Sequence, residues 1–540
     1  MRLPPLPAKD ISFIDEGSLL QESRFIASAA SSVIGRAGLQ WPAGSDPLFL
    51  HVPDAEWPTR WGSVRGESPV TLRPVHTILV ALAMLVAGER PVAGQMVSAF
   101  LGIASVAMAF AIGRRLFGLP AALLAAAALA VSGWHAIYST QALAESDSLL
   151  FVTIAVWLFI RKPERRLLWT GVALGVAFLA NARMWVVLPL LGAADILLRR
   201  PSRSNLLATG RQFLGGFAIP VALVIAITQL ASIAVQNAPH RQYLARQIET
   251  VFKWSLYLFG NPEPLWGTPA LTQAPLVDGL SLYPFLTWAW DGPLLVTLLG
   301  IGLLGALWRR QPADLLVAGL FIGGYLAQTV LTSNSARFFA VLALPAALLA
   351  GRSILLLPRR WHAPATAALL VALLLEGTPR AASLASVPSG YRAAAAFVVQ
   401  HSGGKHLSNQ PPNTGFYTGA ANARWLFEDF DDVRRSVAEG YYLAVVALRP
   451  ALSAAVPWGD RPEVAMLQPL ARFPNPYGDS LQSIMEQHTI APSSRLRDRW
   501  QSSNPEILVY DLRPLLPFLA RELTATVAAR PHELPRGTRR

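Results

Sequence analysis

The sequence has no cysteine and carries little charge. Charged residues make up 15% of the 540 residues, against about 25% in a soluble globular protein. The lack of cysteine excludes disulfide bonds, thiolate metal sites and a cysteine nucleophile, and it leaves the compartment open. Residues 1–9 are rich in proline and not apolar, so we expect no cleavable signal peptide there.

Apolar residues are abundant instead. They form 53% of the chain and give a mean hydropathy of +0.38, which indicates an integral membrane protein with a polar portion attached. The formal net charge of +13 alone could suggest a nucleic-acid partner. The arginines, however, stand mostly in short clusters between apolar segments, as in the cytoplasmic loops of membrane proteins. We therefore expect membrane lipids, and no nucleic acid, as partners.

The apolar segments predict about ten membrane-spanning helices between residues 92 and 378. Their approximate positions are 92–112, 118–137, 148–161, 166–180, 184–198, 212–236, 292–308, 313–332, 338–355 and 363–377. Arginine clusters mark every second loop, at 114–115, 161–166, 199–203, 309–310 and 359–360. The positive-inside rule makes those loops cytoplasmic, so residues 1–91, the loop 237–291 and the chain after 378 lie outside. We expect a multi-pass protein of the bacterial inner membrane.

The first loop, residues 1–91, precedes the predicted bundle. Its apolar stretch from Arg73 to Ala87 is shorter than the ~20 residues that span a bilayer, so we interpret it as a helix lying in the interface. A translocated start of this length normally follows a spanning helix. Either this segment crosses the membrane unaided, or a first helix is encoded upstream of Met1.

Residues 379–520 have the composition of a soluble domain. The runs 442–448 and 506–512 predict buried strands, 393–400 a helix and 473–478 a turn. We expect a small extracytoplasmic α/β domain here. The tail 521–540 is predicted to be disordered.

Asp15 and Glu16 are adjacent carboxylates at the start of an amphipathic stretch. Leu19, Ile26 and Val33 fall on one face of a helix, and several polar residues lie largely off that face. An acidic pair next to so much membrane favours a chemical role. The alternative is that Asp15 caps the helix and Glu16 stabilises its first turn.

Other charged residues lie on the same predicted side of the membrane. They are Arg73, Glu145, Asp147, Arg337 and a basic, aromatic stretch that contains Arg241 and Arg246. Charges at a membrane edge are candidates for function. Carboxylates and cations together suit the attack of a hydroxyl on a phosphate-linked carbon, because a carboxylate takes the proton and cations stabilise the departing phosphate.

Simpler interpretations of these charges stay open. Glu145 would then be a charge favoured by the dipole of the following helix. Arg73 and Arg337 would be snorkelling residues. The stretch around Arg241 would be a membrane-surface helix without a ligand, and His76 would be an interface or packing residue.

Five short motifs follow one another along residues 13–380. They are Asp15-Glu16 before a helix, Arg73-Pro74-Val75, Gly113–Gly118, Tyr138–Ser146, and Arg337 ahead of Leu342–Pro345. In this order they resemble the motifs of the GT-C fold glycosyltransferases of family 39, which include protein O-mannosyltransferases and the lipid A aminoarabinose transferase. The second motif is similar to the family's Lys-Pro-Pro, and the fourth to its Tyr-Ser-Arg-Gln-Ala-Leu-x-Glu. Thr140 stands where the family usually has Arg, which weakens a phosphate contact there.

The resemblance implies a polytopic α-helical fold with a variable outer domain and an inverting transfer of a sugar. The donor would be a polyprenyl-phosphate-linked sugar, and the acceptor a hydroxyl of a protein, lipid or glycan on the outer face. It implies that Asp15 is the base, and we take Glu16, as a supporting contact, and Glu145 as further catalytic candidates. Substrate contacts would come from Arg73, Asp147, Arg241, Arg246 and Arg337. No spacing in the sequence demands a metal, and the divalent ion of some relatives stays open.

A transporter or flippase of a lipid-linked substrate is the alternative from another class. It needs ionisable groups at mid-membrane and broken helices, whereas the predicted helix centres here are almost wholly apolar. A scaffold with an outer binding domain would leave the acidic loops unexplained. The sequence therefore favours an enzyme and determines neither the sugar nor the acceptor.

Overall fold

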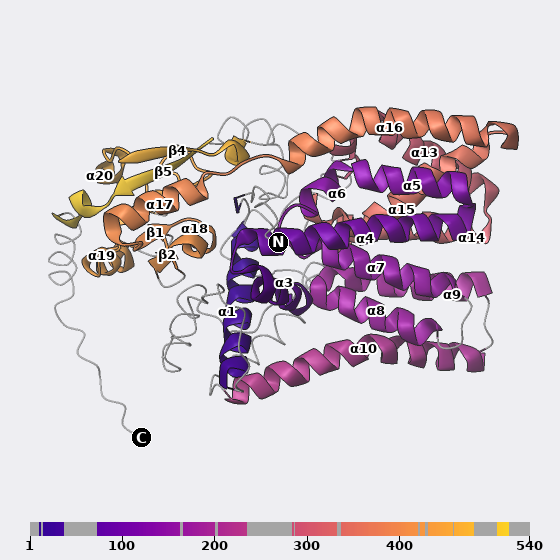
Figure 1. Ribbon diagram of the computed structural model, residues 1–540, viewed down its shortest axis with the longest axis horizontal. Helices are drawn as coiled ribbons and strands as arrows, with labels where there is room; N and C mark the ends of the chain where they lie inside the picture. Colours follow the sequence, from indigo (N-terminus) through magenta and orange to yellow (C-terminus); the bar gives the residue numbers. More distant parts are fainter. Residues whose placement is uncertain are drawn as a thin grey trace, which may run out of the picture.

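The computed structural model consists of a bundle of long helices and a smaller α/β domain, with helix α1 (Ile14–Arg36) between them (Figure 1). It describes residues 10–11, 14–36, 73–161, 166–199, 203–234, 283–285, 287–331, 336–419, 422–426, 430–456, 458–479 and 505–517. The predictions for Arg241, Arg246, most of the loop 237–291 and the tail 521–540 lie outside the described residues.

Helices occupy the ten predicted positions within the described part of the chain. They are α4 (Pro91–Phe117), α5 (Leu119–Val131) with α6 (Gly133–Tyr138), α7 (Glu145–Ile160), α8 (Arg166–Ala180), α9 (Val187–Arg199), α10 (Arg203–Ala234), α13 (Gly292–Arg309), α14 (Pro312–Leu331), α15 (Ala340–Arg352) and α16 (His362–Ala385). Four described segments are long and apolar enough to cross a membrane: Pro91–Phe117, Leu206–Val224, Tyr283–Arg309 and Arg359–Ala385. The protein is thus a multi-pass membrane protein. The stretch that was expected to lie in the interface forms helix α3 (Pro74–Ala87), and its place relative to a membrane stays a prediction.

Helix α15 lies at the centre of the bundle, since all its residues from Ala340 to Arg352 are buried. It packs against α5, α13 and α14. Its approach to α13 needs a glycine, because a Cβ at Gly302 would collide with the carbonyl oxygen of Leu349. Arg352 closes this helix with a buried ion pair, in which its Nη2 donates to Oδ2 of Asp314 at 2.7 Å.

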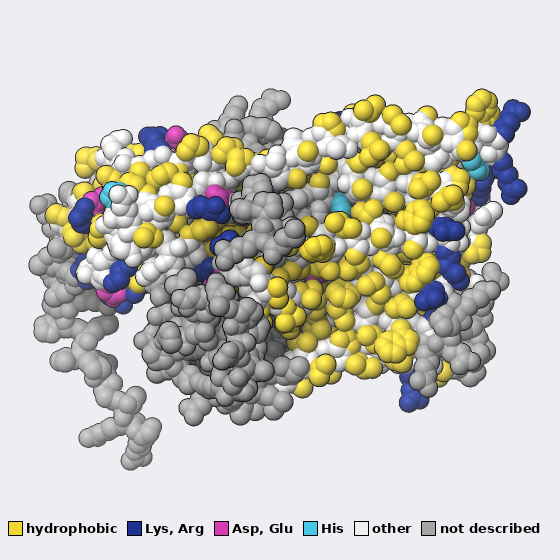
Figure 2. Space-filling model, in the orientation of Figure 1, with side chains coloured by type: hydrophobic (Ala, Val, Ile, Leu, Met, Phe, Trp, Pro, Cys, Tyr) yellow, Lys and Arg dark blue, Asp and Glu magenta, His cyan; other side chains and the backbone are white. Residues whose placement is uncertain are grey.

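The two ends of the bundle differ in charge. Arginines end α4 and α13 and form most of the short helix η7 (Arg359–Trp361), and Lys and Arg side chains gather at the end away from the α/β domain (Figure 2). These arginines are Arg114, Arg115, Arg309, Arg310, Arg359 and Arg360. At the opposite end lie α1, α3 and the start of α7 (Figure 1). We call the first the basic end and the second the domain end.

The C-terminal domain has a five-stranded mixed sheet in the order β2-β1-β3-β5-β4. The strands are β1 (His406–Ser408), β2 (Ala423–Trp425), β3 (Leu443–Val446), β4 (Ala471–Pro474) and β5 (Glu506–Asp511). Strand β1 runs parallel to β2 and β3, whereas β5 is antiparallel to β3 and β4. The helices are α17 (Tyr391–Ser402), α18 (Pro411–Thr418), α19 (Phe430–Ala438) and α20 (Pro462–Ala465). The expected α/β domain is present.

Strands β3 and β5 are those that the sequence predicted, and the predicted helix lies within α17. The predicted turn at 473–478 needs correction at its start, because Phe473 and Pro474 pair with β5 as the end of β4. A 3₁₀ turn, η9 (Pro476–Asp479), follows.

Candidate functional site

The acidic pair lies in the first turn of α1. This helix begins at Ile14, so Asp15 is inside the helix and is not its N-cap, which corrects the simpler interpretation of this residue. The side chain of Asp15 lies outside the described part of the structure. Glu16 is fully buried, and its Oε1 accepts a hydrogen bond of 3.0 Å from the backbone N–H of Ala142. This bond joins α1 to the segment that leads into α7.

Glu145 and Asp147 occupy the first turn of α7, which begins three residues before the predicted start at 148. The dipole of α7 favours carboxylates in its first turn, and this is the simpler interpretation given above for Glu145. Both side chains are nevertheless fully buried, and a charge that serves only as a cap is usually in contact with solvent. Burial on this scale requires partners.

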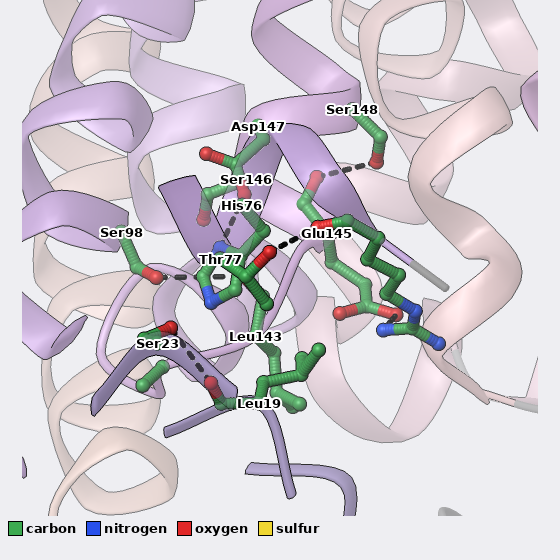
Figure 3. Close-up of polar contacts among 12 residues, drawn as sticks. Leu19, Ser23, His76, Thr77, Ser98, Leu143, Glu145, Ser146, Asp147 and Ser148 are labelled. Carbon is green, nitrogen blue, oxygen red and sulfur yellow. Dashed lines mark hydrogen bonds and ion pairs between the residues drawn. The ribbon is translucent and has the colours of Figure 1, made fainter. Parts of the chain in front are cut away.

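Two residues of the α3 segment supply these partners. Nη1 of Arg73 lies 3.5 Å from Oε1 of Glu145. One turn further along, Nδ1 of His76 donates to Oδ2 of Asp147 at 2.5 Å, and His76 is fully buried as well (Figure 3). The spacing of 73 and 76 places both side chains on the face of α3 that meets α7. His76 is therefore a partner of Asp147, a role that sequence reasoning did not give it.

Arg73, Arg337 and Glu145 lie close enough to Arg183 for their charges to act on it. Arg183 lies in the short helix η2 (Ala182–Val186) between α8 and α9, and Arg337 lies in η5 (Ala336–Phe339) before α15. Burial and then the positive charges of Arg337 and Arg73 lower the pKa of Arg183 to about 9, whereas Tyr283 and Glu145 act in the opposite direction. At neutral pH Arg183 still carries its charge. A guanidinium group with two further guanidinium groups near enough to repel it suits an anionic ligand, above all a phosphate.

Sequence reasoning named Arg73 and Arg337 but missed Arg183. The signal was present, because Arg183 is a lone arginine in a short loop on the side of the membrane where basic clusters are not expected. The structure thus brings Arg73, Glu145 and Arg337 into one electrostatic cluster with Arg183 at the domain end.

The donors for a metal ion do not assemble in the described part of the chain. No group of three or more His, Cys, Asp or Glu side chains lies in an arrangement that could hold one there. Glu145 instead faces Arg73, and Asp147 faces His76.

Comparison with known proteins supports the fold. Residues 68–230 match the sequence profile of the family described as dolichyl-phosphate-mannose-protein mannosyltransferase. The crystal structure of ArnT from Cupriavidus metallidurans in the apo state has a TM-score of 0.52 at 13% identity, and the match covers 94% of this chain and 95% of that one. ArnT from the same organism bound to undecaprenyl phosphate gives a TM-score of 0.48 at 12% identity, with 82% and 90% covered.

A third similar structure is the archaeal oligosaccharyltransferase AglB from Archaeoglobus fulgidus, in complex with an inhibitory peptide and a dolichol-phosphate. Its TM-score is 0.46 at 12% identity, and the match covers 71% of this chain and 63% of that chain, less than two thirds of its length. No curated protein sequence matches this chain. The match to apo ArnT over almost the whole of both chains shows that this protein has the GT-C fold. The resemblance to GT-C fold glycosyltransferases is confirmed at that level.

Proposed function

We propose that this protein is a membrane glycosyltransferase that transfers a sugar from a polyprenyl-phosphate carrier to an acceptor hydroxyl. The observation that carries the proposal is the cluster of Arg73, Arg183 and Arg337 beside buried Glu145, at the domain end of a GT-C bundle. The matching family profile spans 68–230, which includes two of these arginines, and its description names a lipid-phosphate sugar donor.

The proposed reaction displaces phosphate from the anomeric carbon. The acceptor oxygen bonds to that carbon as the bond from the carbon to the phosphate oxygen breaks, so the configuration inverts. Asp15 takes the proton of the acceptor hydroxyl as general base. Phosphate is a good leaving group, so no strong acid is needed at the departing oxygen.

The other predicted residues have supporting roles in this proposal. Arg73, Arg183 and Arg337 would bind the lipid phosphate and stabilise its charge as it leaves. Glu145 would hold Arg73 in place, Asp147 would hold α3 through His76, and Glu16 would support Asp15. Arg241 and Arg246 remain proposed lipid-phosphate contacts.

The arginines of the basic end favour an orientation with the domain end outside. Reporter fusions after Arg310 should then read cytoplasmic, and a fusion after Arg392 should read external. An internal reading at Arg392 would reverse the orientation and place the reaction on the cytoplasmic face.

A transfer assay tests the activity. The purified protein in nanodiscs is given polyprenyl-phosphate sugars one at a time, and product is followed by mass spectrometry. Asp15→Asn should lower turnover by roughly 10²–10⁴-fold and leave donor binding nearly unchanged. Asp460→Asn, a change at an exposed carboxylate of the C-terminal domain, is the matched control. If the protein transfers sugar from none of these donors, the proposed activity is refuted. If a folded Asp15→Asn protein keeps full turnover, Asp15 is not the base, and Glu145 becomes the next candidate.

A further inference from the structure

One face of α1 is bound to the C-terminal domain. Nε2 of Gln21 donates to the carbonyl oxygen of Pro412 at 2.7 Å, and Nη1 of Arg24 donates to that of Phe416 at 2.9 Å. The Arg24 guanidinium also lies 3.8 Å from the centre of the Phe416 ring. Because Gln21 and Arg24 are three residues apart, they share a helix face, and this face lies along α18.

Gly17 continues this face toward the acidic pair. A Cβ at this position would lie 2.7 Å from both the carbonyl carbon and the carbonyl oxygen of Pro412, and would collide with Oδ1 of Asn413. Real side chains do not approach a backbone so closely, so any residue other than glycine would push α1 and α18 apart. The contact is thus closest at the residue that follows Glu16.

The chain on the other side of the acidic pair is bound to the same domain. The backbone N–H of Ile11 donates to the Tyr417 hydroxyl at 3.2 Å, and its carbonyl accepts from Ser389 at 2.5 Å. Asp10 forms an ion pair of 3.1 Å with Arg392. The domain therefore holds residues 10–11 and 17–24, which bracket Asp15 and Glu16.

The bundle holds a different side of α1. Leu20 and Ala27 belong to one buried cluster with Val80 and Met84 of α3, and Phe416 of α18 belongs to the same cluster. Arg24 also contacts the bundle, because its Nε lies 3.1 Å from Oε2 of Glu89, which is between α3 and α4. The first half of α1 thus lies between the domain and the bundle (Figure 1).

We propose that the C-terminal domain positions the Asp15–Glu16 pair, so that the domain is a working part of the catalytic site and not only an appendage to it. Gly17 and Arg24 of α1 are the positioning residues through which the domain holds this helix. The catalytic consequence rests on the proposed function, whereas the displacement of α1 is measurable without it.

The absence of cysteine makes the displacement easy to follow, because every disulfide formed must join two introduced residues. The pair Gln21→Cys and Asn413→Cys reports contact between α1 and α18. The pair Ile26→Cys and Leu85→Cys is chosen to follow α1 against α3, since both side chains pack on the shared cluster, and its cross-linking in the protein that keeps Gly17 is the reference. Gly17→Ala should lower oxidative cross-linking in both pairs, and it should lower kcat by roughly tenfold or more with little change in the donor KM.

Gly215→Ala is the matched control, because its Cβ would meet nothing within 4 Å, and it should change neither cross-linking nor kcat. If Gly17→Ala does not fold, Arg24→Met should give the same changes to a smaller degree.

If only the α1–α18 cross-link is lost, and the α1–α3 cross-link and kcat stay unchanged, the bundle alone fixes the position of α1 and the proposal is overturned. Unchanged cross-linking in both pairs would overturn it too. Failure of the wild-type protein to transfer any sugar would refute the proposed function, and the two cross-links would still decide whether the domain positions α1.

Discussion

His76 and Asp147 form a hydrogen bond of 2.5 Å between two side chains that are both fully buried. It lies one turn of α3 from the Arg73–Glu145 pair, so two polar contacts join the α3 segment to α7. A helix held by apolar contacts alone could slide along its neighbour. Two specific polar contacts fix its register and hence the position of Arg73.

The first prediction concerns the stability of this contact. Asp147→Leu leaves the ring nitrogen of His76 buried without its hydrogen-bond partner and should lower the free energy of unfolding by about 1–3 kcal/mol. The double variant His76→Leu/Asp147→Leu removes both polar groups and should recover most of that loss, since buried pairs replaced by apolar residues are often neutral. Thermal unfolding in detergent measures both. His76→Leu completes the comparison. If the double variant loses as much stability as Asp147→Leu and His76→Leu lose together, the two residues are not energetically coupled.

The second prediction concerns Arg183. Arg183→Gln removes one of three positive charges and should weaken binding of polyprenyl phosphate by about tenfold, because a hydrogen bond to a charged group contributes about 1.5–3 kcal/mol. Arg309→Gln, at an exposed arginine of the basic end, is the control and should not alter binding. Affinity is measured by microscale thermophoresis in nanodiscs. Equal binding by the Arg183→Gln and control proteins would remove Arg183 from the phosphate site.

A third prediction concerns pH and the C-terminal domain. The ring of His406 is buried, with Nδ1 donating to the carbonyl of Gly404 at 2.8 Å and Nε2 accepting from the Thr414 hydroxyl at 2.7 Å. Burial lowers the pKa of His406 from 6.5 to about 4, despite the opposing hydrogen bond to Gly404. The folded state therefore keeps His406 neutral. Its contribution to stability is present above pH 6.5 and is lost as pH falls toward 4, because the unfolded chain takes up the proton first.

The loss over this range should be on the order of 3 kcal/mol, given that one pKa unit corresponds to about 1.4 kcal/mol. Unfolding of the protein between pH 7.5 and pH 4.5 tests it. His406→Gln should flatten the profile, and His401→Gln, at an exposed histidine of α17, should not. A steep acid loss that persists in His406→Gln would assign the effect to other groups.

The sequence predicted the positions of the bundle helices well because each contains an apolar run, although several of these runs are short. It predicted β3 and β5 for a similar reason, since both are continuous buried strands. It missed β1 and β2, which have only three residues each and offer no pattern. For the site, sequence order indicated Arg73, Glu145 and Arg337, but the convergence of Arg183 and the pairing of His76 with Asp147 arise from packing between distant segments, which periodicity does not encode.

The last prediction separates the charge of Glu16 from its hydrogen bond. Glu16→Gln keeps an oxygen that accepts from the N–H of Ala142, so the stability of the fold should stay within about 1 kcal/mol of the wild type. Glu16→Leu removes the acceptor and leaves that buried N–H without a partner, which should cost about 1–3 kcal/mol. If the carboxylate supports Asp15, both variants should lose transfer activity, although only Glu16→Leu loses stability. Activity is measured in the transfer assay, and stability by thermal unfolding of the same preparations. Wild-type turnover in Glu16→Gln would restrict Glu16 to holding α1 against the segment before α7, and Asp15 would then act without its neighbour's charge.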